Sequence, residues 1–171
     1  MVPSQTRTIR GFSLLELLVA MSLLVSAVTA VSVLMRVNYD TWIDHRSDSL
    51  RHEAAVGVLR HMVRQIRQCQ EVSAISAAGD SSGSLTVLMP NGSSVIWDHT
   101  GTNVYYGPTT ADQLLGNHIT ALSLVGYEQD GVTQTTDPSA VQCIRITVTY
   151  ALPQRSVATR SLKSHAWVRA F

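Results

Sequence analysis

The sequence predicts an α+β fold in which one long N-terminal helix packs on a small, mostly antiparallel β-sheet domain. Two observations predict the helix: an apolar run over residues 12–35, and the absence of proline between Pro3 and Pro90. A third observation predicts the sheet, because short β-branched runs separated by Gly, Asn and Pro follow from residue 84 onward. Strands that follow one helix, without alternating helices, favour this architecture.

Length and charge restrict the function. A chain of 171 residues supports one domain with a modest core. The formal net charge is +1 and no strongly basic region is present, so we expect no nucleic-acid partner. The sequence contains no GxSxG, HExxH or P-loop pattern, so we expect neither an enzyme nor a cofactor.

The apolar run, residues 12–35, is long enough to cross a membrane. Its 24 residues would span about 36 Å as a helix, against roughly 30 Å of bilayer hydrocarbon. Arg7 and Arg10 precede the run, which favours a cytoplasmic N-terminus and an extracytoplasmic C-terminal part. Arg36, on the far side, weakens this asymmetry.

Glu16 is the one charged residue in this run. A carboxylate at such a depth costs about 2.5–3.5 kcal/mol on insertion scales, so its presence indicates a function. Two other interpretations must account for it: a secretory signal peptide cleaved after Ala30, and a plain signal anchor.

The run from Arg10 to Leu17 resembles the cleavage and methylation motif of type IV prepilins and pseudopilins. The resemblance implies a leader peptide over residues 1–11, cut between Gly11 and Phe12 by a prepilin peptidase at the cytoplasmic face. It also implies N-methylation of Phe12, with Glu16 as the fifth residue of the mature chain. The protein would sit in the bacterial inner membrane as a single-pass precursor and then join a pilus or pseudopilus.

Chemistry agrees with this resemblance. Cleavage creates an ammonium at Phe12, and an ammonium and the Glu16 carboxylate neutralise each other where neither tolerates hydrocarbon alone. When the ammonium belongs to a neighbouring subunit, the pair also sets the register of assembly. The expected partners are therefore the prepilin peptidase/methyltransferase, other pilin or pseudopilin subunits and the membrane.

Residues 36–76 continue the helix as an amphipathic half. Apolar residues recur there at three- and four-residue steps, which predicts one stripe that covers a sheet face. The stripe consists of Leu50, Ala54, Val58, Leu59, Met62, Val63 and Ile66. Arginines fall largely on the other face, which predicts a solvated or subunit-facing surface.

Residues 84–171 are expected to form the β-rich extracytoplasmic domain. Turn and alternation patterns separate its strands from a polar loop at residues 128–140. The expected strands are residues 84–89, 94–97, 104–106, 117–127, 141–150 and 156–168. A late strand of the Val-x-Ile-x-Val kind, here Ile144, Ile146 and Val148, follows a polar loop, and this layout resembles the PilW and J-type group of minor pilins and pseudopilins. This favours a structural minor subunit that acts in filament assembly.

Two pairs of interpretations stay open for the remaining chemistry. Cys69 and Cys143 are either a disulfide, permitted outside the cytoplasm, or two buried free thiols. Glu128, Asp130 and Asp137 share one loop and are either solvated acids or weak calcium ligands.

Aromatic residues carry the remaining predictions. Trp42 is expected to be an interfacial anchor, and Trp97 and Trp167 are expected in the core. The alternative function, a pilus-tip adhesin or a DNA-uptake binding module, would need an exposed aromatic or basic cluster. Tyr105 and Tyr106 are the candidates for it, although strand packing also accounts for them.

Overall fold

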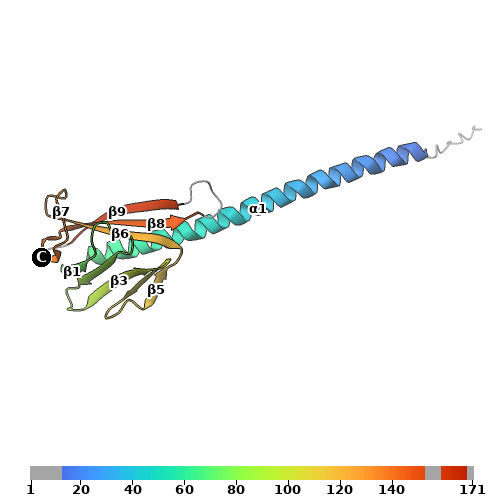
Figure 1. Ribbon diagram of the computed structural model, residues 1–171. Coiled ribbons are helices and arrows are strands. Elements are labelled where there is room, and N and C mark those ends of the chain that lie inside the picture. Colours follow the sequence, from blue (N-terminus) through green and yellow to red (C-terminus); the bar gives the residue numbers. More distant parts are fainter. Residues whose placement is uncertain (1–12, 153–158, 169–171) are drawn as a thin grey trace, which may run out of the picture. The chain divides into compact units, whose positions relative to one another are not determined.

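The computed structural model describes residues 13–152 and 159–168. The expected leader, Phe12 and the start of the expected last strand lie outside these ranges. In the described part of the chain, one helix, α1 (Leu14–Ile66), precedes two β-sheets (Figure 1). The chain divides into two compact units, Met1–Asp44 and His45–Phe171, here named the first and second units.

Ser13 caps the N-terminus of α1. Its hydroxyl accepts a hydrogen bond from the backbone N–H of Glu16 at 3.2 Å. A serine three residues before a glutamate is the capping-box pattern, and a carboxylate in the first turn suits the helix dipole. The described helix therefore begins at Leu14, directly after its cap.

The first unit exposes its apolar side chains. From Leu14 to Ile43, the large apolar residues that the structure describes are exposed. Within the helix, hydroxyl groups donate to carbonyls three or four residues earlier, as that of Ser26 does to Ser22 at 2.9 Å; the donors are Ser22, Ser26, Thr29, Ser32 and Thr41. The helix therefore satisfies these hydroxyl groups with its own carbonyls.

The helix ends earlier than the sequence predicted. We expected it to reach residues 69–76, but α1 ends at Ile66 and residues Glu71–Ile75 form strand β1. The backbone N–H of Gln70 donates to the carbonyl of Leu88 at 2.8 Å, and β1 then pairs antiparallel with the next strand. This pairing with distant residues overrides the helical pattern of the local sequence, so the β-rich part begins at Glu71 rather than at residue 84.

The first sheet is a five-stranded meander with the order β1-β2-β3-β4-β5. The expected strands at residues 84–89, 94–97 and 104–106 are present with shifted ends, and β5 was not predicted. The strands after β1 are β2 (Ser84–Leu88), β3 (Ser94–Thr100), β4 (Asn103–Gly107) and β5 (Gln113–Gly116). Gly92, with φ 80°, lies in the turn between β2 and β3, as the Asn-Gly pair predicted.

The second sheet has four strands in the order β7-β6-β8-β9. Adjacent strands in this sheet pair antiparallel. An isolated parallel bridge joins Ser82 to Leu122 of β6. The loop expected at residues 128–140 contains the two-residue strand β7 and a 3-10 helix, η1. The elements of this part of the chain are β6 (Ile119–Tyr127), β7 (Gln134–Thr135), η1 (Pro138–Ala140), β8 (Cys143–Ala151) and β9 (Thr159–Trp167).

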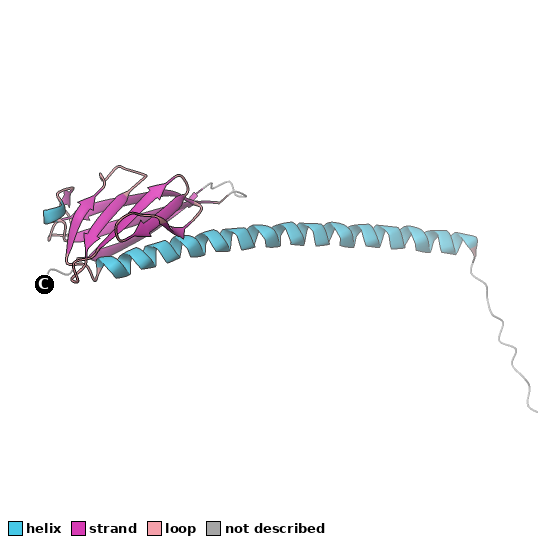
Figure 2. Ribbon diagram, turned by 90° about the horizontal axis from the view of Figure 1, so that it is seen from below, coloured by secondary structure: helices cyan, strands magenta, loops and turns pink. Residues whose placement is uncertain are grey.

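The core of the second unit lies between the end of α1 and both sheets (Figure 2). Val58, Met62 and Ile66 are fully buried, which confirms the centre of the predicted stripe. Leu50, at 59% exposed, lies outside the core and was wrongly assigned to the stripe. The predicted α+β architecture, with a helix packed on antiparallel sheets, is confirmed.

The two tryptophans expected in the core differ. Trp97 is fully buried, as predicted, whereas Trp167 is 52% exposed. Side chains alternate along β9, and Ala166 takes the inward position, so Trp167 points outward.

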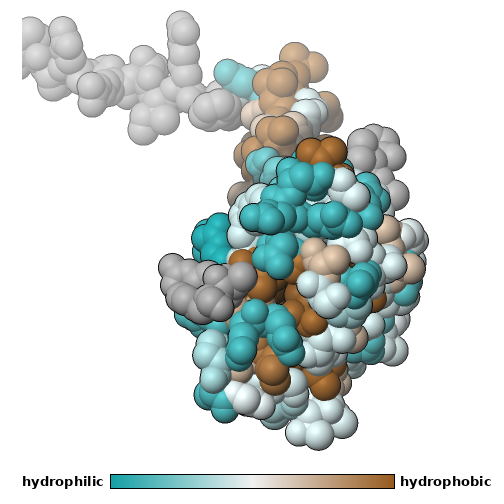
Figure 3. Space-filling view, turned by 90° about the vertical axis from the view of Figure 1, so that its left-hand side faces the viewer, coloured by the Kyte–Doolittle hydropathy of each residue, from teal (hydrophilic) through white to brown (hydrophobic). Residues whose placement is uncertain are grey.

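On the face of the second unit in Figure 3, hydrophobic residues are bordered by hydrophilic ones.

Candidate functional site

The segment around Glu16 combines a lone carboxylate with an apolar helix surface. Glu16 is exposed in the first turn of α1, and no other charged residue occurs between Ser13 and Met35. The described helix is long and apolar enough to cross a membrane, and its most apolar window is not buried by the protein. Gly11 and Phe12, the predicted processing residues, lie outside the described residues.

The two cysteines are free and buried in the structure. They belong to different apolar clusters, and the Cys69 thiol donates to the carbonyl of Ile66 at 3.1 Å. Burial raises the pKa of Cys69 to about 11 and also raises the pKa of Cys143. Thiols with raised pKa values are poor nucleophiles, so the structure gives both a packing role.

The acidic loop uses its carboxylates to hold its own backbone. Asp130 accepts hydrogen bonds from the N–H groups of Val132 and Thr133, each at 2.9 Å. These bonds, after the stronger effect of the Thr133 hydroxyl, lower the pKa of Asp130. Asp137 caps η1. Among the described residues, no group of three or more His, Cys, Asp or Glu is placed to hold a metal ion.

A small aromatic cluster around His61 was missed at the sequence level. The indole N–H of Trp97 donates to Nδ1 of His61 at 3.2 Å. The ring of Tyr106 lies edge-on to the imidazole, with the two ring centroids 4.8 Å apart. Burial, and then the nearby Arg64, lowers the pKa of His61, so the neutral form that accepts from Trp97 is favoured. The periodic arginines around His61 gave no indication of this contact.

Tyr105 and Tyr106, the candidates for an exposed aromatic cluster, lie next to this cluster or on the same strand. Tyr106 packs on the core and on His61, and the hydroxyl of Tyr105 accepts a hydrogen bond from Asn103 at 3.1 Å. Both tyrosines are half-buried. His52 is exposed, and its ring hydrogen-bonds the hydroxyl of Tyr150 at 2.9 Å.

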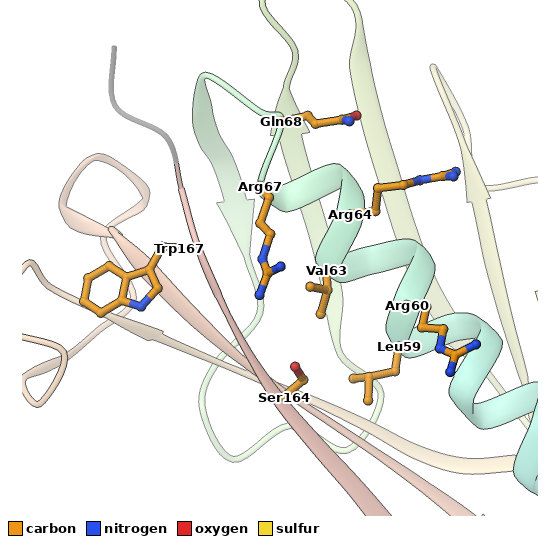
Figure 4. Close-up of a pocket in the computed structure, with 8 residues that line it drawn as sticks. All are labelled: Leu59, Arg60, Val63, Arg64, Arg67, Gln68, Ser164 and Trp167. Atoms are coloured by element: carbon orange, nitrogen blue, oxygen red, sulfur yellow. The ribbon is translucent and has the colours of Figure 1, made fainter.

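A groove of about 770 Å³ lies between α1 and β9 in the second unit. Figure 4 shows Leu59, Val63 and Arg67 on the helical side, with Ser164 and Trp167 on the strand. Leu59 and Val63 supply apolar surface, and Arg60 and Arg64 also line the groove. This is the basic surface that the arginine pattern predicted as solvated or subunit-facing.

Among known families, the prokaryotic N-terminal methylation motif matches the chain over residues 6–32. The matched residues include Gly11, Phe12 and Glu16, the three positions on which the resemblance rests. No curated protein and no solved structure matched the chain.

The motif and the fold together define a type IV pilin-like protein, a class whose members are generally structural. The precursor carries an apolar N-terminal helix as its membrane anchor, and the motif implies processing by prepilin peptidase.

Proposed function

We propose that the chain is a structural minor subunit of a type IV pilus or a type II secretion pseudopilus. It is cleaved after Gly11, methylated at Phe12 and active in filament assembly. The observation that carries the proposal is Glu16, a lone carboxylate in the first turn of an exposed apolar helix and inside the methylation motif. A secretory signal peptide has no use for a charge at this position.

The chemistry of assembly follows from this arrangement. In the bilayer, lipid covers the apolar side chains of the first unit; in the filament, helices of other subunits replace the lipid. The ammonium created at Phe12 neutralises Glu16, either in the same chain or in the next subunit. An ion pair in hydrocarbon tolerates no misalignment, so it sets the register between subunits.

Each segment of the chain has its own role in this proposal. Residues 1–11 are the leader, residues 12–35 cross the membrane, and the remaining helix supports the extracytoplasmic β-rich part. The polar loop followed by β8, which contains Ile144, Ile146 and Val148, supports the PilW and J-type minor group.

Mass spectrometry of the mature protein tests the processing step. We expect a chain that begins at N-methylated Phe12. A chain that begins at Val31 would support the secretory signal peptide instead, and an uncut precursor in cells that process other prepilins would contradict the proposal.

Substitution of Glu16 tests assembly separately. We expect Glu16→Leu to be cleaved normally but lost from sheared filaments, because its partner ammonium would have no counter-charge. Glu16→Asp is the matched control: it keeps the carboxylate and should retain part of the incorporation. Normal incorporation of Glu16→Leu would show that the register contact is wrong.

The adhesin or DNA-uptake alternative has weaker support. Tyr105 and Tyr106 are held by contacts within the chain, which leaves no exposed aromatic platform at this place. Retention of DNA by the second unit, and its loss on replacement of both tyrosines, would favour the alternative.

A further inference from the structure

The second sheet ends in a long strand with an unpaired edge. In the sheet order β7-β6-β8-β9, and within residues 13–152 and 159–168, strand β9 pairs with β8 alone. It has nine residues, whereas the other described strands at sheet edges, β1, β5 and β7, have five, four and two. Natural proteins usually shorten or cover such edges, because the free backbone groups can pair with a strand of another chain. The length of β9 therefore indicates a use for its edge.

Alternate residues of β9 turn their backbone groups toward this free edge. The backbone N–H of Val168 donates to the carbonyl of Gln142 at 2.9 Å, so the even-numbered residues of β9 face β8. The N–H and C=O groups of Ser161, Lys163 and His165 consequently point away from β8. Among the described residues, no helix or loop forms a backbone hydrogen bond to them. The edge thus carries the alternating donors and acceptors that a further strand needs.

Three arginines border the groove between α1 and β9. Arg60, Arg64 and Arg67 follow steps of four and three residues, so they lie on one face of the helix. All three are exposed, and in the described part of the chain none of their guanidinium groups has a hydrogen bond or an ion pair. The residues that line the groove include no acid, and β9 adds the exposed Arg160 and Lys163. The groove therefore presents positive charge to any molecule that enters it.

We propose that β9 and this arginine row are the docking site for an extended, acidic segment of a partner protein, which joins the second sheet as a further strand. Figure 4 shows Leu59, Val63 and Arg67 pointing from the helix toward β9. The methylene groups of the partner's acidic side chains cover the two apolar residues. Their carboxylates then reach the guanidinium groups, which form the stronger, charge-assisted kind of hydrogen bond.

The spacing of the arginines suits an extended segment. Arg60 and Arg64 are separated by a rise of about 6 Å along the helix axis. Alternate residues of a strand are about 6.6–6.8 Å apart and point to the same face. Carboxylates at every second position of the partner segment can therefore meet successive arginines while its backbone pairs with β9.

Charge disfavours a second copy of this chain as the occupant. Two β9 strands paired edge to edge would bring Arg160 and Lys163 of both copies together, and like charges on neighbouring strands are destabilising. The strand contains no acidic residue that could relieve this repulsion. The site lies in the second unit alone, so the inference goes beyond the proposed filament function and does not depend on it.

Peptide binding to the full-length protein in detergent tests the site. The probe is a fluorescent nine-residue peptide of alternating glutamate and threonine with blocked ends, and binding is followed by anisotropy. Two further versions carry methyl groups on the backbone nitrogens, one at the threonines and one at the glutamates. We expect only one of these versions to bind, because one set of N–H groups faces β9 and the other faces solvent. Any result in which the two versions bind alike would overturn strand addition and indicate attraction between charges alone.

Two substitutions of one residue test the strand edge. Lys163→Pro removes an N–H group that points away from β8, so the pairing with β8 is kept while a new strand loses a donor. We expect it to weaken binding of the unmethylated peptide about tenfold. Lys163→Ala is the matched control: it removes the same charge but keeps the N–H group, and it should bind nearly as well as the original protein.

A second pair of variants tests the arginine row. We expect Arg60→Gln with Arg67→Gln to weaken binding about tenfold, because two of the charged contacts are lost. Thr102→Glu with Gln113→Glu is the matched control, since it makes the same change in net charge at exposed positions outside the groove. Its binding should stay nearly unchanged.

Each outcome decides one part of the proposal. Unchanged binding by folded Lys163→Pro would reject the strand edge, and unchanged binding by the double arginine variant would reject the arginine row. Self-association of the protein without peptide, lost in Lys163→Pro, would assign the edge to a second copy instead. Methylation of Phe12 and presence in filaments are measured separately, so failure of the filament function and failure of this site are distinguishable.

Discussion

Gly116 offers a quantitative test of how the helix packs in the second unit. A Cβ built at this glycine would lie 2.5 Å from Cγ2 of Val58 and 3.3 Å from Cδ1 of Ile119. Val58 is fully buried, so it has no free space to move into. We expect Gly116→Ala to destabilise the fold by about 1–3 kcal/mol, the usual cost of an overpacked core.

Removal of the opposing side chain should relieve the clash. Val58→Ala alone should cost about 2 kcal/mol, from two lost methyl groups and the space they leave. In the double variant, the alanine at position 116 occupies part of that space. We therefore expect the double variant to lose about 1–2 kcal/mol less unfolding free energy than the two single variants lose together. A coupling of this size is typical of residues in contact.

Urea unfolding of residues 45–171, followed by tryptophan fluorescence, measures these free energies. Trp97 is fully buried and reports the loss of the core. Gly79→Ala is the control, because a Cβ there meets nothing within 4 Å, and it should be close to neutral. Additive costs for Gly116→Ala and Val58→Ala, or an unchanged stability of Gly116→Ala, would refute the packing between β5 and α1.

Three further predictions concern titration, thiol reactivity and the acidic loop. The folded-state pKa of His61 is lowered below its usual 6.5, so the contribution of His61 to stability is present above pH 6.5 and is lost as pH falls. The free energy of unfolding should therefore decrease between pH 7.5 and 5.5. The decrease should be smaller in His61→Phe, which cannot take up the proton. Cys69 and Cys143 should resist a maleimide at pH 7 until urea unfolds the chain, and rapid labelling of the folded protein would contradict their burial. Asp130→Ala should speed limited proteolysis at residues 128–133, because the carboxylate holds two backbone N–H groups there; an unchanged cleavage rate would show that these bonds do not order the loop.

The sequence was sufficient for features that depend on local pattern. The apolar run over residues 12–35 is recognised by its length and composition, and the stripe at Val58, Met62 and Ile66 repeats with helical period, which places it on one face. The Asn-Gly turn before β3 is likewise local, because positive φ at Gly92 needs no distant partner.

Features that depend on distant pairing were not accessible in this way. Residues 71–75 contain glutamate and alanine, which suit a helix, and they become a strand through pairing with β2. Trp167 illustrates the period of two along a strand, because a shift of one residue moves a side chain to the opposite face. The contact between His61 and Trp97 joins two residues that are 36 positions apart in the sequence, and no local pattern indicates it.

The first unit raises a different physical question, because its surface is incompatible with water. In the described part of the helix, apolar side chains from Leu14 to Ile43 are exposed on every side, whereas a helix that packs on one sheet needs a single apolar stripe. Burial by the rest of the same chain is not observed for the most apolar window. The stabilising contacts must therefore come from lipid or from other chains, and an apolar environment of either kind makes the unpaired charge of Glu16 costly. A cation near Glu16 would offset this cost, and the cleavage that we propose between Gly11 and Phe12 would supply one at the N-terminus of the helix.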